Sequence, residues 1–253
     1  MYKILANTVF LGKDVHFLPE SHSTNDIALS LVREKKASEG SIVICDHQTR
    51  GKGQRGNSWE TEKGKNLTFS IALKPHFLDI SEQFNLNMAI SNGIRSFLQE
   101  YIPDICVKWP NDLVVPGFGK IGGVLIENII SGSRWDAAVV GIGLNINQTN
   151  FSTSNSCSLS SITGSSYALQ ELLRYLVVEL ERTYIQLKKG KVNEIKAEYL
   201  THLFLRDQWA DFSAKGEQFS GKIVGVSKEG LLEVAGESSL IQCFGFQEIK
   251  LLY

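Results

Sequence analysis

Apolar positions along the chain follow two different spacings, and together they predict a fold that combines helices with strands. Compact apolar runs typical of buried strands occur at 41–46, 66–74, 124–126 and 136–147. Helical spacing occurs at 27–37, within 80–101, at 167–188 and at 191–204. We expect Ser23 or Thr24 to cap the first helix and Gly40 to end it. The polar stretch 148–166 is expected to be a loop.

The pattern changes from about Leu205 onward. Short alternating segments separated by glycine turns occur at 218–226, 230–236, 239–245 and 248–253. Such segments predict a small SH3-like barrel of about five strands. We therefore expect an α+β catalytic domain at 1–204, with a central mixed sheet flanked by helices, and a barrel domain at 205–253.

The stretch 48–59, QTRGKGQRGNSW, combines glycines with cations. Gly51, Gly53 and Gly56 leave bare backbone N–H groups beside basic side chains, as an anionic ligand requires. The loop formally matches G-x-G-x-x-G after a strand, but 57–65 has no helical period, and a dinucleotide-binding loop must lead into a helix. It nearly matches a Walker loop, but Asn57 stands where the lysine is needed. A phosphate or carboxylate site and a solvated hairpin turn both remain open.

A second candidate lies in VKWPNDL, at 107–113. Pro110 cannot donate to a sheet, so the strand must end there, and Lys108, Asn111 and Asp112 lie at a strand end. The alternative is a turn with an Asx motif.

A third candidate is GKIGGVLIE, at 119–127. Lys120 stands beside Gly122 and Gly123, and adjacent glycines in a strand indicate that another backbone or a ligand approaches closely. A lysine there is a candidate partner for phosphate or carboxylate; a β-bulge with a surface lysine is the alternative. The next strand carries glycines at 141 and 143, so the two strands would form a flat floor. Asn145 at its edge could contact an adenine or cap a turn.

Composition narrows the class of protein. The 253 residues are 43% hydrophobic and 21% charged with a net charge of −1, so no overall basic field indicates nucleic acid. The sequence has neither an apolar run long enough for a membrane span nor the features of a signal peptide. The four cysteines are far apart, which favours reduced thiols in a cytoplasmic protein.

Taken in order, the motifs STN, Q-T-x-G-x-G-x-x-G-x-x-W, KWPND, K-I-G-G-x-L-I-E and GIGLNIN resemble the catalytic core of biotin protein ligases. The resemblance covers the whole chain, including the small C-terminal barrel. It points to the monofunctional type, without the N-terminal DNA-binding domain. It implies the catalytic fold shared with class II aminoacyl-tRNA synthetases. Lipoate ligases share the fold but not this loop.

The resemblance also implies a reaction. Biotin attacks the α-phosphate of ATP to give biotinyl-5′-AMP, and a lysine of a biotin carboxyl carrier protein then takes the biotinyl group. The substrates would be biotin and ATP with Mg²⁺, without DNA or membrane partners, and a homodimer is compatible with the family. The alternatives are a lipoate or octanoate–protein ligase and a non-enzymatic biotin-binding regulator.

Site residues carried over from the family fall into three overlapping groups. Those expected at biotin are Ser23, Thr24, Asn25, Gln48, Gly51, Lys52, Gly53, Gln54, Lys120, Gly122 and Gly123. Those expected at ATP or the adenylate are Lys52, Gln54, Arg55, Trp59, Asn111, Lys120 and Asn145. The expected catalytic residues are Lys120, Arg55, Lys108 and Asp112. Mg²⁺ is expected to bind mainly through the phosphates, with Asp112 as the candidate protein ligand.

The glycine loop departs from the family pattern, which is richer in arginine. Lys52, Gln54 and Asn57 stand where arginines are common, and Arg50 and Arg55 remain. Gln54 cannot offer a phosphate a bidentate cation. Either Arg55 takes over part of that role or the adenylate is held less tightly.

Overall fold

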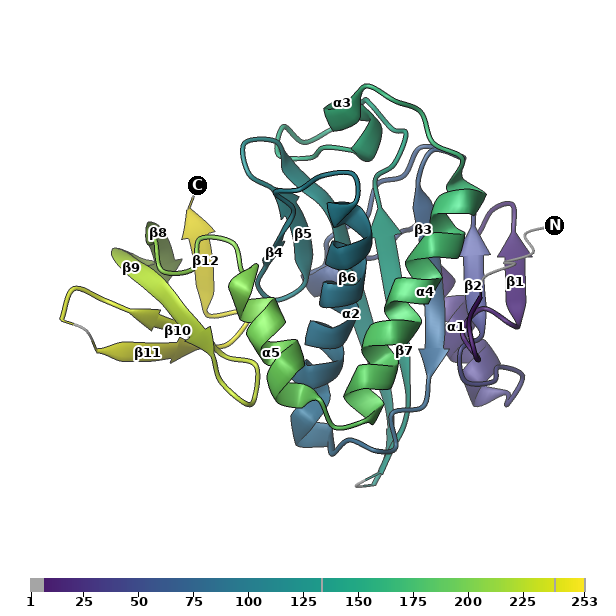
Figure 1. Cartoon of the computed structure of the whole chain (residues 1–253), viewed down its shortest axis with the longest axis horizontal. Coiled ribbons are helices and arrows are strands. Elements are labelled where there is room, and N and C mark those ends of the chain that lie inside the picture. The colour runs from purple at the N-terminus through teal and green to yellow at the C-terminus, as the bar shows by residue number, and fades with distance from the viewer. Residues whose placement is uncertain (1–6, 133, 239, 253) are drawn as a thin grey trace.

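A seven-stranded mixed sheet forms the centre of the larger part of the molecule (Figure 1). The computed structural model describes residues 7–132, 134–238 and 240–252. The strand order is β1 (Val15–Leu18), β2 (Ile42–Cys45), β3 (Leu67–Leu73), β7 (Arg134–Leu144), β6 (Gly119–Ser131), β5 (Asp112–Val115) and β4 (Cys106–Lys108). Only β1 and β2 pair in parallel among these neighbours, so the predicted mixed sheet is confirmed.

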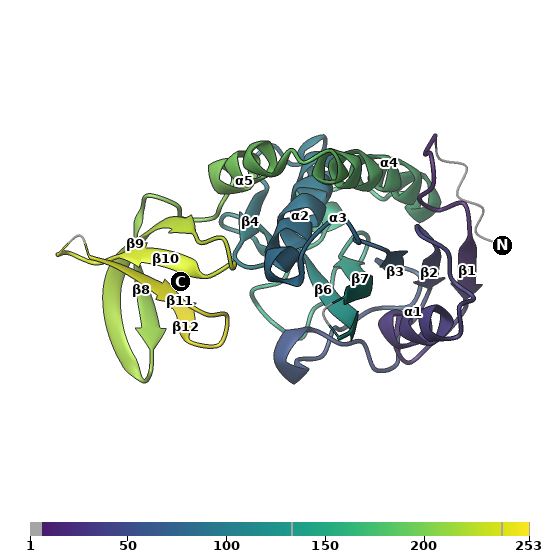
Figure 2. The same cartoon turned by 90° about the horizontal axis from the view of Figure 1, so that it is seen from below.

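Helices cover both faces of this sheet, which explains why its central strands are continuously apolar. In Figure 2, α2 (Gln83–Gln99), α4 (Leu169–Lys188) and α5 (Val192–Thr201) lie on one side, and α1 (Thr24–Arg33) lies on the other. The main core lies between the sheet and the first group, and a smaller cluster of Ala28, Leu29, Val43 and Val139 lies under α1. All seven residues of β3 are buried, as expected for a strand covered on both faces.

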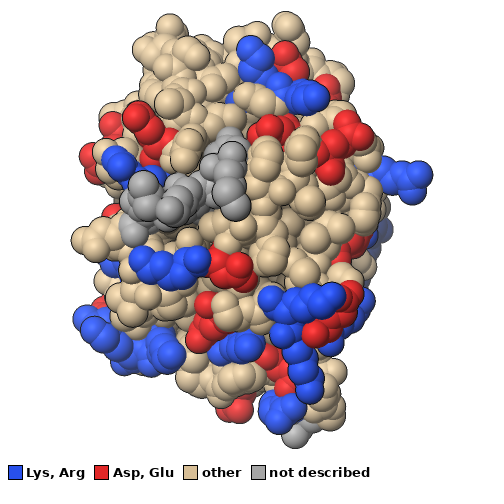
Figure 3. Space-filling model, turned by 90° about the vertical axis from the view of Figure 1, so that its right-hand side faces the viewer, with Lys and Arg blue, Asp and Glu red and all other residues tan. Residues whose placement is uncertain are grey.

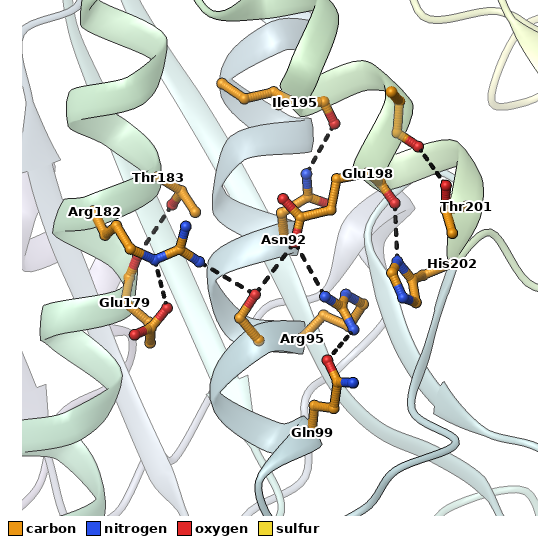
Figure 4. A network of polar contacts seen from close by, with 12 residues as sticks. Asn92, Arg95, Gln99, Glu179, Arg182, Thr183, Ile195, Glu198, Thr201 and His202 are labelled. Atoms are coloured by element: carbon orange, nitrogen blue, oxygen red, sulfur yellow. Dashed lines mark hydrogen bonds and ion pairs between the residues drawn. The ribbon is translucent and has the colours of Figure 1, made fainter.

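Polar contacts fasten the three helices of the first group to one another (Figure 4). Asn92 of α2 donates from Nδ2 to the carbonyl of Ile195 on α5 at 2.9 Å. Arg95, also on α2 and buried, bonds Glu198 of α5 at 3.1 Å. Because the charge of Arg95 is paired, its burial is tolerated, and α5 is held in a fixed position next to α2.

The second sheet is antiparallel and lies beside the β4 edge of the first (Figure 1). Its order is β11 (Ile241–Phe244), β10 (Leu232–Ala235), β9 (Glu217–Val226), β8 (Trp209–Ala214) and β12 (Ile249–Leu252). Five strands match the SH3-like prediction, although β8 was not among the expected segments. Ser239 and Tyr253, which the expected strands include, lie outside the described residues.

The connection between the two sheets is hydrogen-bonded at both ends. Val107 of β4 donates to His202 and accepts from Phe204, both at 2.9 Å. Asp207 then donates to Ile223 of β9 at 3.0 Å. This connecting segment therefore covers the outer edge of β4 and continues directly onto the second sheet.

The sequence-based boundaries were wrong at the end of the first helix. The α1 helix ends at Arg33, and Lys35 adopts a left-handed φ of 57°. Gly40 instead leads into β2 with a φ of +85°, where a methyl group would lie 2.7 Å from the Phe10 ring. Strand β1 was not expected, and the short helix α3 (Leu159–Thr163) lies within the predicted loop. Two 3-10 turns, η1 (Gln54–Gly56) and η2 (Ile80–Glu82), complete the described elements.

Acidic and basic side chains are interspersed on the face shown in Figure 3, in keeping with a net charge of −1. Within the part of the chain that the structure describes, no helix has the length and apolar character needed to cross a bilayer.

Candidate active site

A cavity of about 750 Å³ lies where the glycine loop, the start of α1, strands β6 and β7, and the second sheet come together. It brings together thirteen of the residues predicted from sequence. They are Ser23, Thr24, Asn25, Gln48, Lys52, Gly53, Gln54, Trp59, Lys108, Asn111, Asp112, Lys120 and Gly123. Segments distant in the sequence thus form one continuous pocket.

The start of α1 contributes a polar wall instead of an ordinary side-chain cap. Ser23 occupies the N-cap position but makes no capping side-chain bond. The backbone N–H of Thr24 instead donates to Oε1 of Gln48 at 2.7 Å, and its hydroxyl lies 3.2 Å from the same oxygen. Because an amide side chain satisfies one helix N–H, Gln48 is fixed in orientation beside the pocket.

Ser70 and Glu127 extend this wall beneath the helix. Oγ of Ser70 lies 2.7 Å from Oγ1 of Thr24 and 2.6 Å from Oδ1 of Asn25. Nδ2 of Asn25 donates to Oε2 of Glu127 at 2.8 Å. Gly141 makes room for Asn25, since a methyl group there would lie 2.3 Å from Oδ1. The predicted glycine floor therefore accommodates a buried polar network.

The glycine loop folds back on itself as a narrow hairpin. Trp59 donates to the carbonyl of Gly51 at 2.8 Å, and Gly53 donates to Asn57 at 2.7 Å. A methyl group at Gly51 would lie 2.3 Å from the Trp59 carbonyl oxygen, so this close approach requires glycine. The loop leads into β3 without an intervening α-helix, which rules out the Rossmann-type arrangement.

Lys52 of this loop is paired with the first turn of α1. Its Nζ lies 2.6 Å from Oδ1 of Asp26, and this hydrogen bond is the main cause that raises the pKa of Lys52. The contact ties the hairpin to α1 at the rim of the cavity.

Lys120 extends over the glycine floor toward Asp112. Its Nζ lies 2.7 Å from Oδ1 of Asp112 and 5.6 Å from the ring centroid of Trp59. Gly123 pairs with Asp112 across β5 and β6, and a methyl group at Gly123 would lie 3.2 Å from Nζ of Lys120. The pairing of β5 with β6 shifts register beside Lys120, so the bulge of the alternative is present, but the lysine on it lines the cavity and pairs with Asp112.

The turn that carries Asp112 is held from two helices. The carbonyl of Pro110 accepts from Nδ2 of Asn87 on α2 and from the hydroxyl of Tyr199 on α5, both at 2.8 Å. Asn111 donates to the carbonyl of Val124 and accepts from its N–H. Burial raises the pKa of Tyr199, so its hydroxyl remains a donor.

Four predicted residues do not add side chains to the described lining. Gly51 packs on Trp59, and Gly122 packs on Leu144, where a methyl group would lie 2.4 Å from Cδ2. Asn145 is buried and donates to Cys157 at 3.1 Å, and none of the described residues bonds its Oδ1. Arg55 belongs to η1, but its side chain lies outside what the structure describes.

Sequence reasoning missed several residues that complete the cavity. Trp109 and Phe246 line it, and Ser70 orders its polar wall. Trp109 lay inside the KWPND motif and could have been singled out. The role of Phe246 could not be predicted, because nothing in the sequence indicates which loops of the second sheet face the first sheet.

Comparison with known proteins now decides the family. Residues 18–145 match the model of the biotin/lipoate A/B protein ligase family. The chain belongs to this family. Its matched region extends from β1 to the start of the segment after β7, and it includes the polar wall, the glycine loop and Lys120.

Relatives within this family are similar over most of the chain. The bifunctional ligase/repressor BirA of Bacillus spizizenii is 25% identical over 245 residues, 89% of this chain and 70% of that protein. BirA of Escherichia coli is 33% identical over 137 residues, 54% of this chain and 41% of that protein. The solved biotin protein ligase of Aquifex aeolicus in complex with biotin and ATP has a TM-score of 0.78 and 25% identity. It covers 95% of this chain and 99% of that one.

Proposed function

We propose that this family member is an ATP-dependent biotin–protein ligase. A carboxylate oxygen of biotin attacks the α-phosphorus of ATP, forming biotinyl-5′-AMP and releasing pyrophosphate. The amine of a carrier-protein lysine then attacks the acyl carbon, forming an amide and releasing AMP and a proton. The observation that carries the proposal is the charge of the cavity. Its charged lining residues among those described are Lys52, Lys108, Lys120, Lys250 and Asp112.

Positive charge is what the first step requires, because a carboxylate and a triphosphate repel each other as they approach. Lys120 is the best-placed cation, since it extends over a glycine floor on the long strand β6. A preorganised cation lowers the barrier because little reorganisation is needed as charge develops on the phosphorus oxygens. Asp112 is positioned to orient the ammonium group of Lys120.

The polar wall suits the other end of biotin. A ureido ring offers two N–H donors and one carbonyl acceptor, and Thr24, Asn25 and Gln48 offer hydroxyl and amide groups of both kinds. We propose that these side chains bind the ring, while Lys52 and Lys120 attract the carboxylate at the end of the tail.

Trp59 and the glycine hairpin close one side of the cavity. We propose that the indole packs near the adenine and that the hairpin excludes water, which would otherwise hydrolyse the mixed anhydride. Asn145 is proposed as an adenine contact because its Oδ1 lacks a partner among the described residues. The side chain is buried outside the cavity lining, so nucleotide binding would have to uncover it.

The chemistry of the lining is compatible with Mg²⁺. Asp112 is a partly buried carboxylate beside Lys120, and Mg²⁺ is commonly held by one or two carboxylates together with substrate phosphates. The described residues contain no cluster of three His, Cys, Asp or Glu side chains for a metal. We propose Asp112 as the protein ligand, where bound Mg²⁺ would neutralise phosphate charge.

The decisive experiment combines the purified chain with biotin, MgATP and a biotin carboxyl carrier domain, followed by intact-mass measurement of the carrier. Addition of one biotinyl group to one lysine is the expected result. Omission of ATP and Lys120→Ala are the controls. The family name also covers lipoate ligases, so octanoate and lipoate are tested in parallel. Modification by either in preference to biotin would assign the rival activity.

Three further expectations accompany this function. We propose that the protein acts in the cytoplasm, where ATP and carrier proteins meet, and light scattering will test whether it forms the homodimer compatible with its family. A gel-shift on biotin-operator DNA is expected to show no retardation. Specific retardation would instead support a regulator.

A further inference from the structure

Trp109, which was not assigned a role from sequence, contacts the second sheet from within the site. Its indole Nε1 donates to the carbonyl of Gly230 at 3.0 Å. Its ring lies edge-on to Phe246, with centroids 5.8 Å apart and an interplanar angle of 69°. Gly230 lies in the turn between β9 and β10, and Phe246 lies between β11 and β12. Two separate loops of the second sheet therefore meet on one side chain.

The turn at Gly230 is itself seated on helix α2. Gly230 has a φ of +88°, and a methyl group there would lie 2.5 Å from the ring of Phe84. Phe84 in turn packs edge-on against Tyr199, with ring centroids 5.8 Å apart. Tyr199 donates to the carbonyl of Pro110, the residue after Trp109. The contact is consequently part of a packed group and not an isolated surface bond.

This group lies directly next to the reacting end of the cavity. Trp109 follows β4, the strand of the first sheet nearest the second in Figure 1. Three residues after Trp109, Asp112 pairs with Lys120 at 2.7 Å. Within the polar wall, Thr24 bonds Gln48, and Thr24 and Asn25 bond Ser70 of β3 and Leu125 and Glu127 of β6. None of these bonds involves Trp109 or either loop of the second sheet.

We propose that the second sheet is a positioning element for the Asp112–Lys120 pair and acts through Trp109, with Gly230 and Phe246 as its contacts. The inference rests on the proposed function for the step that it affects. Loosening Trp109 lets the 108–112 turn fluctuate, so Lys120 spends less time aligned for attack on the α-phosphorus. The biotin wall stays intact, so biotin affinity and adenylation respond differently.

Two conservative variants test this coupling, and a third serves as control. Trp109→Phe removes the N–H donor and keeps an aromatic ring, and Phe246→Leu removes the aromatic edge and keeps an apolar side chain. Lys228→Ala is the matched control, because Lys228 lies in the same turn as Gly230 but extends to Glu82 of η2 at 3.7 Å. The readouts are hydrogen exchange of a peptide covering 107–113, biotin affinity by calorimetry, and pyrophosphate release at varied ATP.

We expect faster exchange of the 107–113 peptide in both test variants, relative to wild type and Lys228→Ala. Loss of one hydrogen bond predicts a fall of about two- to tenfold in kcat for adenylation. Biotin affinity should stay within about twofold, and the double variant should lose less than the product of the single losses, since both act through one element.

Unchanged exchange and unchanged adenylation in both variants would overturn the inference. So would a parallel loss of biotin affinity and adenylation, because that indicates general destabilisation. If wild-type protein releases no pyrophosphate with biotin, the proposed function fails, but hydrogen exchange still tests whether the second sheet orders the 108–112 turn.

Discussion

The indole of Trp59 lies directly on the backbone of Gly143, so closely that a methyl group at Gly143 would come within 2.4 Å of ring carbon Cε2. The first residue belongs to the glycine loop and the second to the central strand β7. The packing of the loop on the sheet therefore depends on a missing side chain in the sheet. The indole of Trp59 and the backbone at Gly143 are complementary surfaces. A side chain added at Gly143 should therefore move the loop.

Gly143→Ala should displace Trp59 while leaving the sheet intact. Alanine suits a strand at least as well as glycine does, so we expect a change in the free energy of unfolding below about 1 kcal/mol. The loop should become more open to limited proteolysis, and KM for ATP should rise about tenfold through loss of ring packing near the adenine. Urea unfolding and pyrophosphate release measure the two effects.

Gly236→Ala is the matched control for this prediction, because a methyl group there meets no atom within 4 Å. Equal KM values for ATP in wild type and Gly143→Ala would show that Trp59 takes no part in nucleotide binding.

Lys120→Ala should remove the cation proposed to act at the α-phosphate. Loss of one strong transition-state contact predicts a fall in adenylation of about two or more orders of magnitude. Biotin affinity should fall much less, because the wall at Thr24 and Gln48 remains. Pyrophosphate release measures the rate, and Lys188→Ala, at the exposed end of α4, is the control. Near-normal release from Lys120→Ala would remove this side chain from the chemistry.

The glycine loop offers a gain-of-contact test at Gln54. Its Oε1 is buried, and none of the described residues donates to it. Arginine at this position would supply a bidentate cation, and a charge-assisted hydrogen bond is worth about 1.5–3 kcal/mol. Under the proposed function, Gln54→Arg should slow dissociation of biotinyl-5′-AMP by about tenfold or more.

Release of labelled adenylate after rapid gel filtration measures this rate. Gln242→Arg on the exposed strand β11 adds the same charge far from the loop and serves as control. Identical release rates from wild type and Gln54→Arg would mean that the glutamine at position 54 does not weaken adenylate binding.

Local patterns revealed most of the secondary structure and the members of the site, because helix and strand periodicity depend on neighbours in the chain. The turn at Pro110 was predicted correctly, since proline cannot continue a ladder. The end of α1 was missed because Lys35 takes a left-handed φ without any glycine to signal it. The residue pattern alone offered Ser23 or Thr24 as a helix cap and did not indicate that Thr24 bonds Gln48, because the two are twenty-four residues apart.

Contacts made at longer range had no local signal at all. Trp109 donates to Gly230 across 121 residues, and neither residue's neighbours indicate the other. The same holds for Ser70 and Asn25, which meet because α1 packs across β3. The sequence therefore predicted which charged residues and glycines form the site. Their orientation depends on tertiary packing, which local patterns do not show.

Asp26→Asn should break the ion pair with Lys52 and so loosen the attachment of the glycine hairpin to α1. Pairing with Asp26 raises the pKa of Lys52 above its ordinary value of 10.5. A raised lysine pKa means that the stabilisation is fully present below pH 10.5 and is lost as the pH rises through the higher folded value. Because Nε2 of His22 lies 3.5 Å from Oδ2 of Asp26, the comparison starts at about pH 8, above the range in which histidines change charge. The difference in unfolding free energy between wild type and Asp26→Asn should be constant from there to about pH 9 and shrink above about pH 10.5.

Because Lys52 is about half exposed, that difference should be small, within the ~1 kcal/mol typical of a surface pair. The larger effect should be faster limited proteolysis within 50–65 at neutral pH. Glu34→Gln, which breaks the exposed pair with Lys36 beyond the end of α1, is the control. Cleavage of Asp26→Asn at the wild-type rate would show that the ion pair does not protect the loop, and that its other contacts are enough to hold it.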